Sequence, residues 1–145
     1  MMSYKYKLLV IDDEQAVLTE IKNYFEKREF LVETALTGEE GLEKLRQQMF
    51  EVVLIDLVMP GISGIDVIRA INDEGISVSS AIITGHGDKD EAIAALQLGA
   101  ENWFQKGTQE AQMPNLYSQI IKLAQLIPEE KLEDFMDILN QKNVA

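Results

Sequence analysis

The sequence predicts an α/β fold in which a parallel sheet is covered by helices on both faces. Three observations lead to this prediction. Short apolar runs alternate five times with longer amphipathic segments, which is typical of strands alternating with helices. The apolar runs are nearly continuous rather than alternately polar, as expected of strands buried on both sides. The length of 145 residues suits one such domain with a single sizeable core.

The first three elements follow from their periodicity. Residues 7–11 form a continuous apolar run rich in strand-forming side chains, and residues 30–35 also read as a strand. Between them, residues 15–27 place apolar side chains at helical spacing on one face. We therefore expect a strand, a helix and a second strand, joined by a right-handed crossover.

The next elements have recognisable boundaries. Thr37 can cap a helix over residues 38–48, because Glu40 stands at the capping-box position. Residues 51–56 read as a third buried strand, and the Pro-Gly pair at 60–61 ends the loop after it. The second half repeats the pattern, with helices expected over 64–72, 88–98 and 114–126 and strands over 80–84 and 102–105.

A further helix is expected beyond this unit. Pro128 interrupts the pattern and residues 129–142 read as a helix, so we separate a helical extension over 127–145 from the domain over 5–126. The apolar stripe of this helix consists of Leu132, Phe135, Met136 and Leu139. We expect the stripe to dock on the domain's own core. A dimer contact and a linker to an output domain are the alternatives.

The composition excludes several classes of site. The chain has no cysteine and one histidine, so disulfides, thiolate catalysis and multi-histidine metal centres are ruled out. Its formal net charge of −12 repels nucleic acid and anionic lipid, and no basic patch reverses this locally. The N-terminal apolar run is too short for a signal peptide or a membrane span. We therefore expect a cytoplasmic protein that contacts neither nucleic acid nor membrane directly.

Polar side chains stand where the expected strands end. Asp12 and Asp13 follow the first strand, and Asp56 ends the third. Thr84 ends the fourth strand, and Lys106 lies just past the fifth. Functional groups of open parallel sheets gather outside these carboxyl ends, where the strand order reverses. If the first and third strands are neighbours, the three aspartates meet in one pocket. Each residue taken singly also has an ordinary explanation as a cap, a turn or a solvated side chain.

This set of side chains predicts a particular chemistry. Clustered carboxylates repel one another, and a hard cation offsets the repulsion. Mg²⁺ prefers oxygen ligands, usually one or two carboxylates together with phosphate oxygens. Thr84 offers a hydroxyl hydrogen bond, and Lys106 offers a positive charge to a carboxylate or a phosphoryl oxygen. The sequence therefore predicts phosphoryl transfer to an aspartate, with Mg²⁺ as the cofactor.

Several motifs surround these residues. They are Leu-Leu-Val-Ile-Asp-Asp-Glu at 8–14, Val-Val-Leu-Ile-Asp-Leu-Val-Met-Pro-Gly-Ile-Ser-Gly at 52–64, Ile-Ile-Thr-Gly at 82–85, Leu-Gly-Ala at 98–100 and Phe-Gln-Lys at 104–106. As a set, which spans roughly residues 5 to 126, they resemble the receiver domain family of two-component response regulators. The resemblance implies a doubly wound five-stranded parallel sheet in the order 2-1-3-4-5, which is the flavodoxin-like topology.

The resemblance also implies a role for each acidic residue. Asp56 takes the place of the phosphoacceptor. Asp13 and Asp56 match the direct Mg²⁺ ligands, together with the backbone carbonyl of Val58. Asp12 corresponds to the carboxylate that acts on the metal mainly through water.

Other positions match the groups around the phosphoryl site. Thr84 and Lys106 correspond to the partners of the phosphoryl oxygens, and Trp103 occupies the switch position, where the family usually has Tyr or Phe. Val58 and His86 flank the pocket and are candidates for tuning hydrolysis of the acyl phosphate. Gly107 departs from the family pattern, which usually has a cis proline after the lysine.

The same resemblance implies a place in a phosphorelay. The expected donor is a sensor histidine kinase or a phosphotransfer protein, and the expected output is an altered preference for a downstream protein effector. Homodimerisation on phosphorylation is a further expectation. The chain is not expected to be an enzyme, beyond catalysing its own phosphorylation and dephosphorylation.

Three alternative functions are compatible with parts of this pattern. A phosphatase of the haloacid-dehalogenase type has its nucleophile in an Asp-x-Asp motif after the first strand. A flavodoxin-like electron carrier has a Ser/Thr/Gly-rich phosphate loop there, where residues 12–14 of this chain are all acidic. A receiver that serves only as a docking module, without phosphorylation, is the third alternative.

Overall fold

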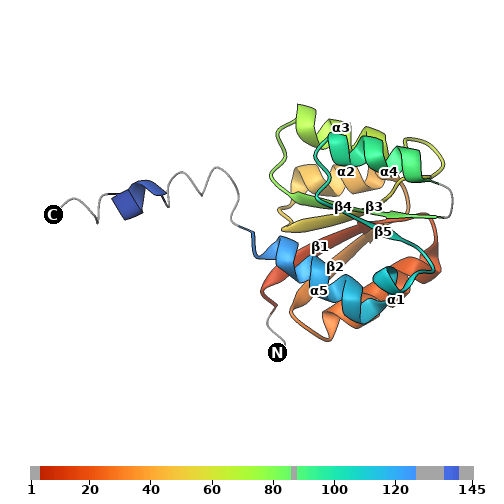
Figure 1. Ribbon diagram of the computed structural model, residues 1–145, viewed down its shortest axis with the longest axis horizontal. Helices are drawn as coiled ribbons and strands as arrows, with labels where there is room; N and C mark the ends of the chain where they lie inside the picture. The colour runs from red at the N-terminus through yellow and green to blue at the C-terminus, as the bar shows by residue number, and fades with distance from the viewer. Residues whose placement is uncertain (1–3, 86–87, 127–135, 141–145) are drawn as a thin grey trace.

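The computed structural model describes residues 4–85, 88–126 and 136–140, and it confirms the predicted architecture. Five parallel strands form one sheet in the order β2-β1-β3-β4-β5 (Figure 1). The strands are β1 Tyr6–Ile11, β2 Phe30–Ala35, β3 Val52–Asp56, β4 Ser79–Thr84 and β5 Asn102–Gln105. The helices are α1 Gln15–Glu26, α2 Gly38–Gln47, α3 Gly64–Asp73, α4 Lys89–Gln97 and α5 Met113–Ala124. The observed bounds differ from the predicted ones by at most two residues, as is usual at element ends.

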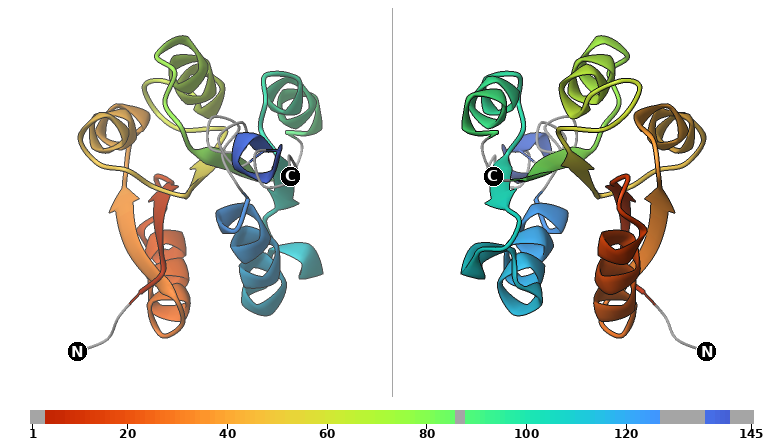
Figure 2. Two further views of the ribbon diagram at one scale, coloured as in Figure 1. Left: turned by 90° about the vertical axis from the view of Figure 1, so that its left-hand side faces the viewer. Right: turned by 90° about the vertical axis from the view of Figure 1, so that its right-hand side faces the viewer.

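The helices form two layers around the sheet. Helices α2, α3 and α4 cover one face, and α1 and α5 cover the other (Figures 1 and 2). The chain passes from β1 outward to β2 and then returns past β1 to β3, β4 and β5. The order therefore reverses between β1 and β3, which run side by side with Ile11 paired to Ile55. In open α/β sheets this reversal creates a crevice at the carboxyl edge.

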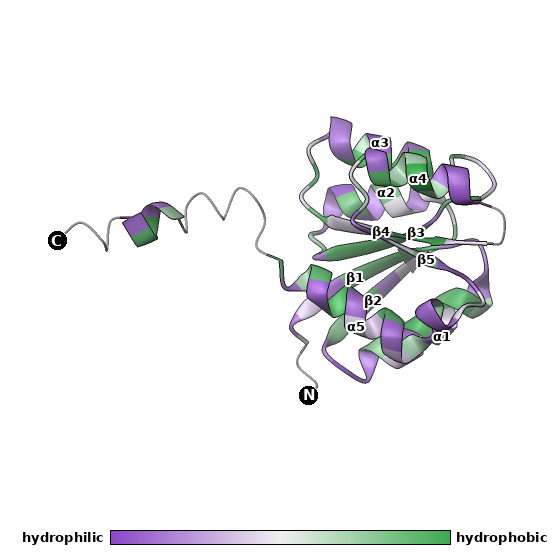
Figure 3. Cartoon of the chain, viewed as in Figure 1, coloured by the Kyte–Doolittle hydropathy of each residue, from purple (hydrophilic) through white to green (hydrophobic). Residues whose placement is uncertain are grey.

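Each face of the sheet packs against its own hydrophobic cluster. Leu9, Val53 and Ile82 belong to the cluster on the side of α2, α3 and α4. Leu8 and Leu54 belong to the cluster on the side of α1 and α5. Neighbouring residues separate in this way because successive side chains of a strand point to opposite faces. The central strands β1 and β3 are therefore buried and apolar toward both faces, which explains their continuous apolar runs. The strands in the middle of Figure 3 are accordingly coloured largely as hydrophobic.

The helix starts differ in part from the prediction. The Thr37 hydroxyl accepts a hydrogen bond from the Glu40 N–H at 3.1 Å, as expected of the cap of α2. The Glu40 carboxylate, however, accepts from the N–H of Leu36 at 3.2 Å, so the reciprocal bond of a capping box to Thr37 is replaced by one to its neighbour. A complete capping box forms instead between Ser63 and Asp66 at the start of α3, which the sequence analysis missed.

The loop after β5 takes a course that proline cannot follow. Gly107 has a φ of +81°, whereas a proline ring fixes φ near −65°. The described residues contain no cis peptide bond. A short 3₁₀ helix over Gln109–Ala111, which the sequence did not predict, continues the loop toward α5. The glycine at position 107, where the family usually has proline, therefore adopts a conformation that proline cannot.

The C-terminal extension is described only in part. Residues 136–140 are helical, which agrees with a helix in this region, while the rest of the predicted range 129–142, including Leu132 and Phe135, lies outside the described residues. Met136, Ile138 and Leu139 are 48%, 51% and 39% exposed. The expected docking on the domain core is therefore not observed for Met136 and Leu139, the two residues of the predicted stripe that the structure describes. None of the described helices is long and apolar enough to cross a membrane.

Candidate functional site

Three carboxylates meet at the carboxyl ends of β1 and β3, as the sequence predicted. Asp12 directly follows β1, and Asp56 is the last residue of β3. One oxygen from each of Asp12, Asp13 and Asp56 lies within 4.8 Å of the others. Asp12 is 0% and Asp56 is 3% exposed, whereas Asp13 is exposed to solvent. The cluster thus combines two buried carboxylates with one at the surface.

The alternation of side chains along the strands explains why these groups converge. Leu54, two residues before Asp56, points to the α1 and α5 side of the sheet, as does Phe104, two residues before Lys106. Val10, two residues before Asp12, points to the same side. Asp12, Asp56 and Lys106 therefore continue one face of three different strands, just beyond the point where the hydrophobic cluster ends.

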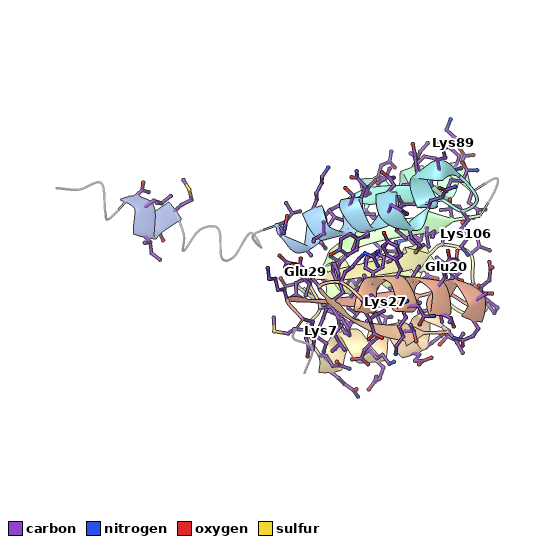
Figure 4. All side chains as sticks on the ribbon, turned by 90° about the horizontal axis from the view of Figure 1, so that it is seen from below. Lys7, Glu20, Lys27, Glu29, Lys89 and Lys106 are labelled. Carbon is purple, nitrogen blue, oxygen red and sulfur yellow. The ribbon has the colours of Figure 1, made fainter. Side chains whose placement is uncertain are left out.

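Lys106 is the cationic partner of the cluster. Its Nζ lies 2.9 Å from Oδ2 of Asp12, 3.2 Å from Oδ2 of Asp56 and 3.0 Å from Oε1 of Glu14. In Figure 4, Lys106 lies at the same end of the molecule as Lys89 at the start of α4, and Lys7 on β1 lies at the opposite end. Glu14 was not among the predicted site residues. Its position directly after the two aspartates of the first motif is the sequence signal that could have indicated it.

Backbone N–H groups orient the two buried carboxylates. The Glu14 N–H donates to Oδ1 of Asp12 at 2.8 Å, and the Val58 N–H donates to Oδ1 of Asp56 at 3.2 Å. The other oxygen of each carboxylate faces Lys106. Oδ2 of Asp12 accepts no hydrogen bond from the described residues, so its close contact with the ammonium is an ion pair without hydrogen-bond geometry.

Burial and mutual repulsion disfavour the ionised forms of the two buried aspartates. Burial, followed by the negative charge of Asp12, raises the pKa of Asp56 to about 6, although Lys106 and the Val58 N–H act in the opposite direction. Burial also raises the pKa of Asp12 above its ordinary value, against the effects of the Glu14 N–H and Lys106. For Lys106, burial lowers the pKa, but the surrounding carboxylates outweigh burial and raise it above its ordinary value.

The donor set fits a hard divalent cation. Mg²⁺ binds oxygen ligands at 2.0–2.1 Å, so two ligands on opposite sides of the ion lie roughly 4.2 Å apart. The spread of 4.8 Å among the three carboxylate oxygens is close to this span. Oδ2 of Asp12, which accepts no hydrogen bond from the described residues, is available to a cation or its water shell. The residues present therefore match the predicted cofactor in chemistry and in approximate size.

Thr84 and Trp103 form a separate pair beside the cluster. Thr84 ends β4 and is 1% exposed. Among the described residues, no hydrogen bond joins Thr84 to Asp56. Instead, Nε1 of the half-buried Trp103 donates to Oγ1 of Thr84 at 3.0 Å. The structure thus groups the aspartates with Lys106 and groups Thr84 with the predicted switch residue.

The loop after Asp56 is held close to the strand end. A Cβ atom at Gly64 would meet the backbone oxygen of Asp56 at 2.5 Å, so a larger residue at position 64 would push the loop away. The Glu39 carboxylate accepts from the Ile62 N–H at 3.2 Å and ties the loop to α2. The Val58 side chain is 52% exposed, and His86 lies outside the described residues. The tuning roles expected of Val58 and His86 stay predictions.

Comparison with known proteins gives a consistent result. The sequence profile of the response regulator receiver domain matches residues 8–118. The response regulator SaeR of Staphylococcus epidermidis is 30% identical over 99 residues, which are 68% of this chain and 43% of that protein. The alkaline phosphatase synthesis regulator PhoP of Bacillus subtilis is 27% identical over 100 residues, or 69% of this chain and 42% of that protein. The chain therefore spans about two fifths of the length of these curated relatives.

Solved structures show the same likeness. A receiver domain from Clostridium thermocellum is 34% identical with a TM-score of 0.75, covering 83% of this chain and 94% of that one. The profile match extends over most of the chain and includes Asp12, Asp13, Asp56, Thr84 and Lys106. From the strand order, the convergent carboxylates and these matches, we conclude that the chain belongs to the response regulator receiver domain family of two-component signalling systems.

Proposed function

We propose that this receiver domain accepts a phosphoryl group on Asp56 from the phosphohistidine of a sensor kinase or a phosphotransfer protein. The observation that supports the proposal most strongly is the contact of one ammonium, Lys106, with two buried carboxylates, Asp12 and Asp56. Such a surplus of buried negative charge opposes folding. It suits a site that receives a cation and a phosphoryl group.

Asp56 is the nucleophile in this proposal. Its pKa of about 6 leaves roughly ten ionised carboxylates for each protonated one at pH 7. The Val58 N–H fixes one oxygen, and the other faces Lys106. The bond from phosphorus to the donor imidazole nitrogen breaks as a bond from phosphorus to the Asp56 carboxylate forms, giving an acyl phosphate. Attack of water on that phosphorus later releases inorganic phosphate and restores the carboxylate.

The metal ligands follow from the resemblance and from the donor set. Asp13, Asp56 and the carbonyl of Val58 would bind Mg²⁺ directly, and Asp12 would act through water. When bound, Mg²⁺ supplies positive charge to the phosphoryl oxygens during transfer. Lys106 already contacts Oδ2 of Asp56 and provides a second positive charge beside that carboxylate.

The switch would depend on bonds that form only after phosphorylation. A shift from 1:99 to 99:1 between two conformations takes about 5.5 kcal/mol of differential binding. Hydrogen bonds to charged groups contribute roughly 1.5–3 kcal/mol each, so about two to four bonds that are absent before phosphorylation are needed, and Thr84 would make one of them. The affected surface would be that of α4, β5 and α5. Ile93 and Leu96 on α4 are already 41% and 37% exposed there, which suits contact with a protein effector.

Three further assignments concern the location of the protein, its C-terminal extension and its oligomeric state. We assign the reaction to the cytoplasm and residues 127–145 to a helical extension that follows the domain over 5–126. The exposed apolar side chains within 136–140 suit a dimer contact or a linker. Homodimerisation on phosphorylation is checked by sedimentation with and without beryllofluoride, a phosphoryl mimic. A monomer under both conditions would refute it.

Labelling with a small phosphoryl donor tests the proposed function. Wild-type protein incubated with acetyl phosphate and Mg²⁺ should gain one labile phosphoryl group by intact mass, and chelation of Mg²⁺ should prevent this. Asp56→Asn should gain none. Asp73→Asn, a matched change of an exposed aspartate at the end of α3, should be labelled like wild type. Labelling of Asp56→Asn would contradict the site assignment. No labelling of wild type would favour the docking-only alternative.

A further inference from the structure

The indole N–H of Trp103 contacts the hydroxyl that the proposed reaction uses. Nε1 donates to Oγ1 of Thr84 at 3.0 Å. An indole nitrogen can only donate, whereas a threonine hydroxyl donates one hydrogen bond and accepts up to two. The bond therefore makes Thr84 an acceptor toward Trp103, and it directs the O–H of Thr84 away from the indole.

The strand register explains how the ring reaches this hydroxyl. Trp103 on β5 pairs with Ile82 on β4, and Thr84 lies two residues further along β4. Since side chains alternate along a strand, Ile82, Thr84 and Trp103 share one face of the sheet. The indole thus extends diagonally toward the carboxyl edge and packs beside the cluster of α2, α3 and α4. Phenylalanine has no donor at this point, and tyrosine has its hydroxyl at the far end of the ring.

The hydroxyl of Thr84 retains an unused donor. The residue is 1% exposed, and its O–H donates to no acceptor within the described residues. A buried O–H group without an acceptor costs free energy, and a new acceptor placed along its direction would recover that cost. In the sheet, Asp56 pairs with Ile83, so Thr84 stands one residue beyond the partner of Asp56 at the same edge. Thr84 continues the face of α2, α3 and α4, whereas Asp56 continues the face of α1 and α5, so the two side chains can meet only beyond the strand ends, where a phosphoryl group would extend Asp56. A phosphoryl oxygen on Asp56 accepts hydrogen bonds only, and this donor would complement it.

We infer that Trp103 is a positioning residue for phosphoryl binding, whose indole N–H orients the Thr84 hydroxyl as a donor to a phosphoryl oxygen on Asp56. The inference rests on the proposed function. It goes beyond the expected switch position, because it assigns the effect to the indole nitrogen rather than to the volume of the ring. Trp103 acts through Thr84 and does not itself contact the phosphoryl group.

Binding of beryllofluoride in the presence of Mg²⁺, measured by calorimetry, tests the inference. Trp103→Phe keeps an aromatic ring and removes the N–H, and it should weaken mimic binding about 2- to 12-fold, the range of one net hydrogen bond. The affinity for Mg²⁺ alone should stay the same. In a Thr84→Val background, Trp103→Phe should cause no further weakening, because the hydroxyl that it orients is gone.

A second variant separates the hydrogen bond from packing. Trp103 is the single tryptophan of the sequence, so its replacement by β-(3-benzothienyl)alanine changes one site only. This analogue keeps the bicyclic ring and has sulfur in place of the N–H, and it should weaken mimic binding as much as Trp103→Phe does. If Trp103→Phe fails to fold, the analogue decides the question.

The possible outcomes distinguish this inference from the proposed function. Unchanged or tighter mimic binding by the two Trp103 variants, with normal binding by wild type, overturns the inference alone. The inference is also overturned if Trp103→Phe weakens mimic binding as much in the Thr84→Val background as in the wild type, because the effect would then not depend on the Thr84 hydroxyl. Wild-type protein that binds no beryllofluoride overturns the proposed function, and the inference with it.

Discussion

Replacing Asp56 with asparagine is expected to stabilise the folded protein at pH 7, although it should abolish phosphorylation. The Asp56 side chain is 5% exposed. Burial and the charge of Asp12 raise its pKa from 3.8 to about 6, despite the opposing effect of Lys106. In the unfolded chain the same carboxyl group ionises near its ordinary value. Folding at pH 7 therefore places a carboxylate where its charge is disfavoured.

The size and pH dependence of the effect follow from proton linkage. Between the two pKa values the folded state binds more protons than the unfolded state, so the free energy of unfolding falls as the pH rises. The destabilisation is small below about pH 4, grows between pH 4 and 6 and is complete above that window. The difference between 3.8 and about 6, at 1.36 kcal/mol per pH unit, corresponds to about 3 kcal/mol. Asp56→Asn should therefore gain up to about 3 kcal/mol at pH 7 and little at pH 4.

Urea unfolding followed by circular dichroism measures this gain. A chelator must be present, because a bound cation would offset the penalty in wild type. At this chain length, about 3 kcal/mol corresponds to a rise of roughly 6–12 °C in Tm. Glu20→Gln removes the same charge from an exposed position on α1 and should change stability by no more than about 0.5 kcal/mol. Equal or lower stability of Asp56→Asn at pH 7, or a gain of the same size at pH 4, would refute the reasoning.

Three other predictions follow from the site and its loops. Mg²⁺ should raise the Tm of the wild type because it binds the folded state, and Asp13→Asn should reduce that rise. Thermal unfolding at increasing Mg²⁺ concentrations measures both effects. Lys106→Met removes the cation from two buried carboxylates, so the free energy of unfolding in urea at pH 7 should fall by about 3 kcal/mol. At pH 4, where Asp56 is protonated, the fall should be smaller. Gly107→Ala forces a Cβ into a φ of +81° and should cost about 1–2 kcal/mol in the same assay; an unchanged unfolding midpoint would show that the loop relaxes at no cost.

The fold was predictable because its signals are local and repeated. Strands β1 and β3 are nearly continuous apolar runs, the other strands have apolar centres, and each crossover helix has its own apolar face. Sequence patterns therefore located every strand and every helix of the domain to within two residues. The strand order came from the resemblance, because parallel pairing joins segments that are distant in sequence. The missed elements are of a different kind. The 3₁₀ turn over Gln109–Ala111 has three residues and no apolar periodicity to reveal it.

The site was predictable to the extent that strand ends determine it. Asp12, Asp56 and Lys106 converge because each continues the same face of its strand. The contact of Lys106 with Glu14 joins residues 92 apart, and it depends on side-chain conformations that sequence spacing does not fix. The bond from Trp103 to Thr84 likewise depends on the register of β4 and β5. Long-range contacts between side chains therefore mark the limit of the sequence analysis.

The existing contacts of Lys106 reduce the free energy that this residue can contribute to the switch. In this structure its ammonium already contacts Asp12, Glu14 and Asp56, so pairing with a phosphoryl group would exchange partners rather than add a bond. A ligand shifts an equilibrium only by the difference in its interactions with the two states. Thr84 differs in this respect, because its buried donor has no acceptor among the described residues and any bond to a phosphoryl oxygen would be new. We therefore expect Thr84, held by Trp103, to contribute more to the switch than Lys106, although Lys106 makes more contacts with the site before phosphorylation.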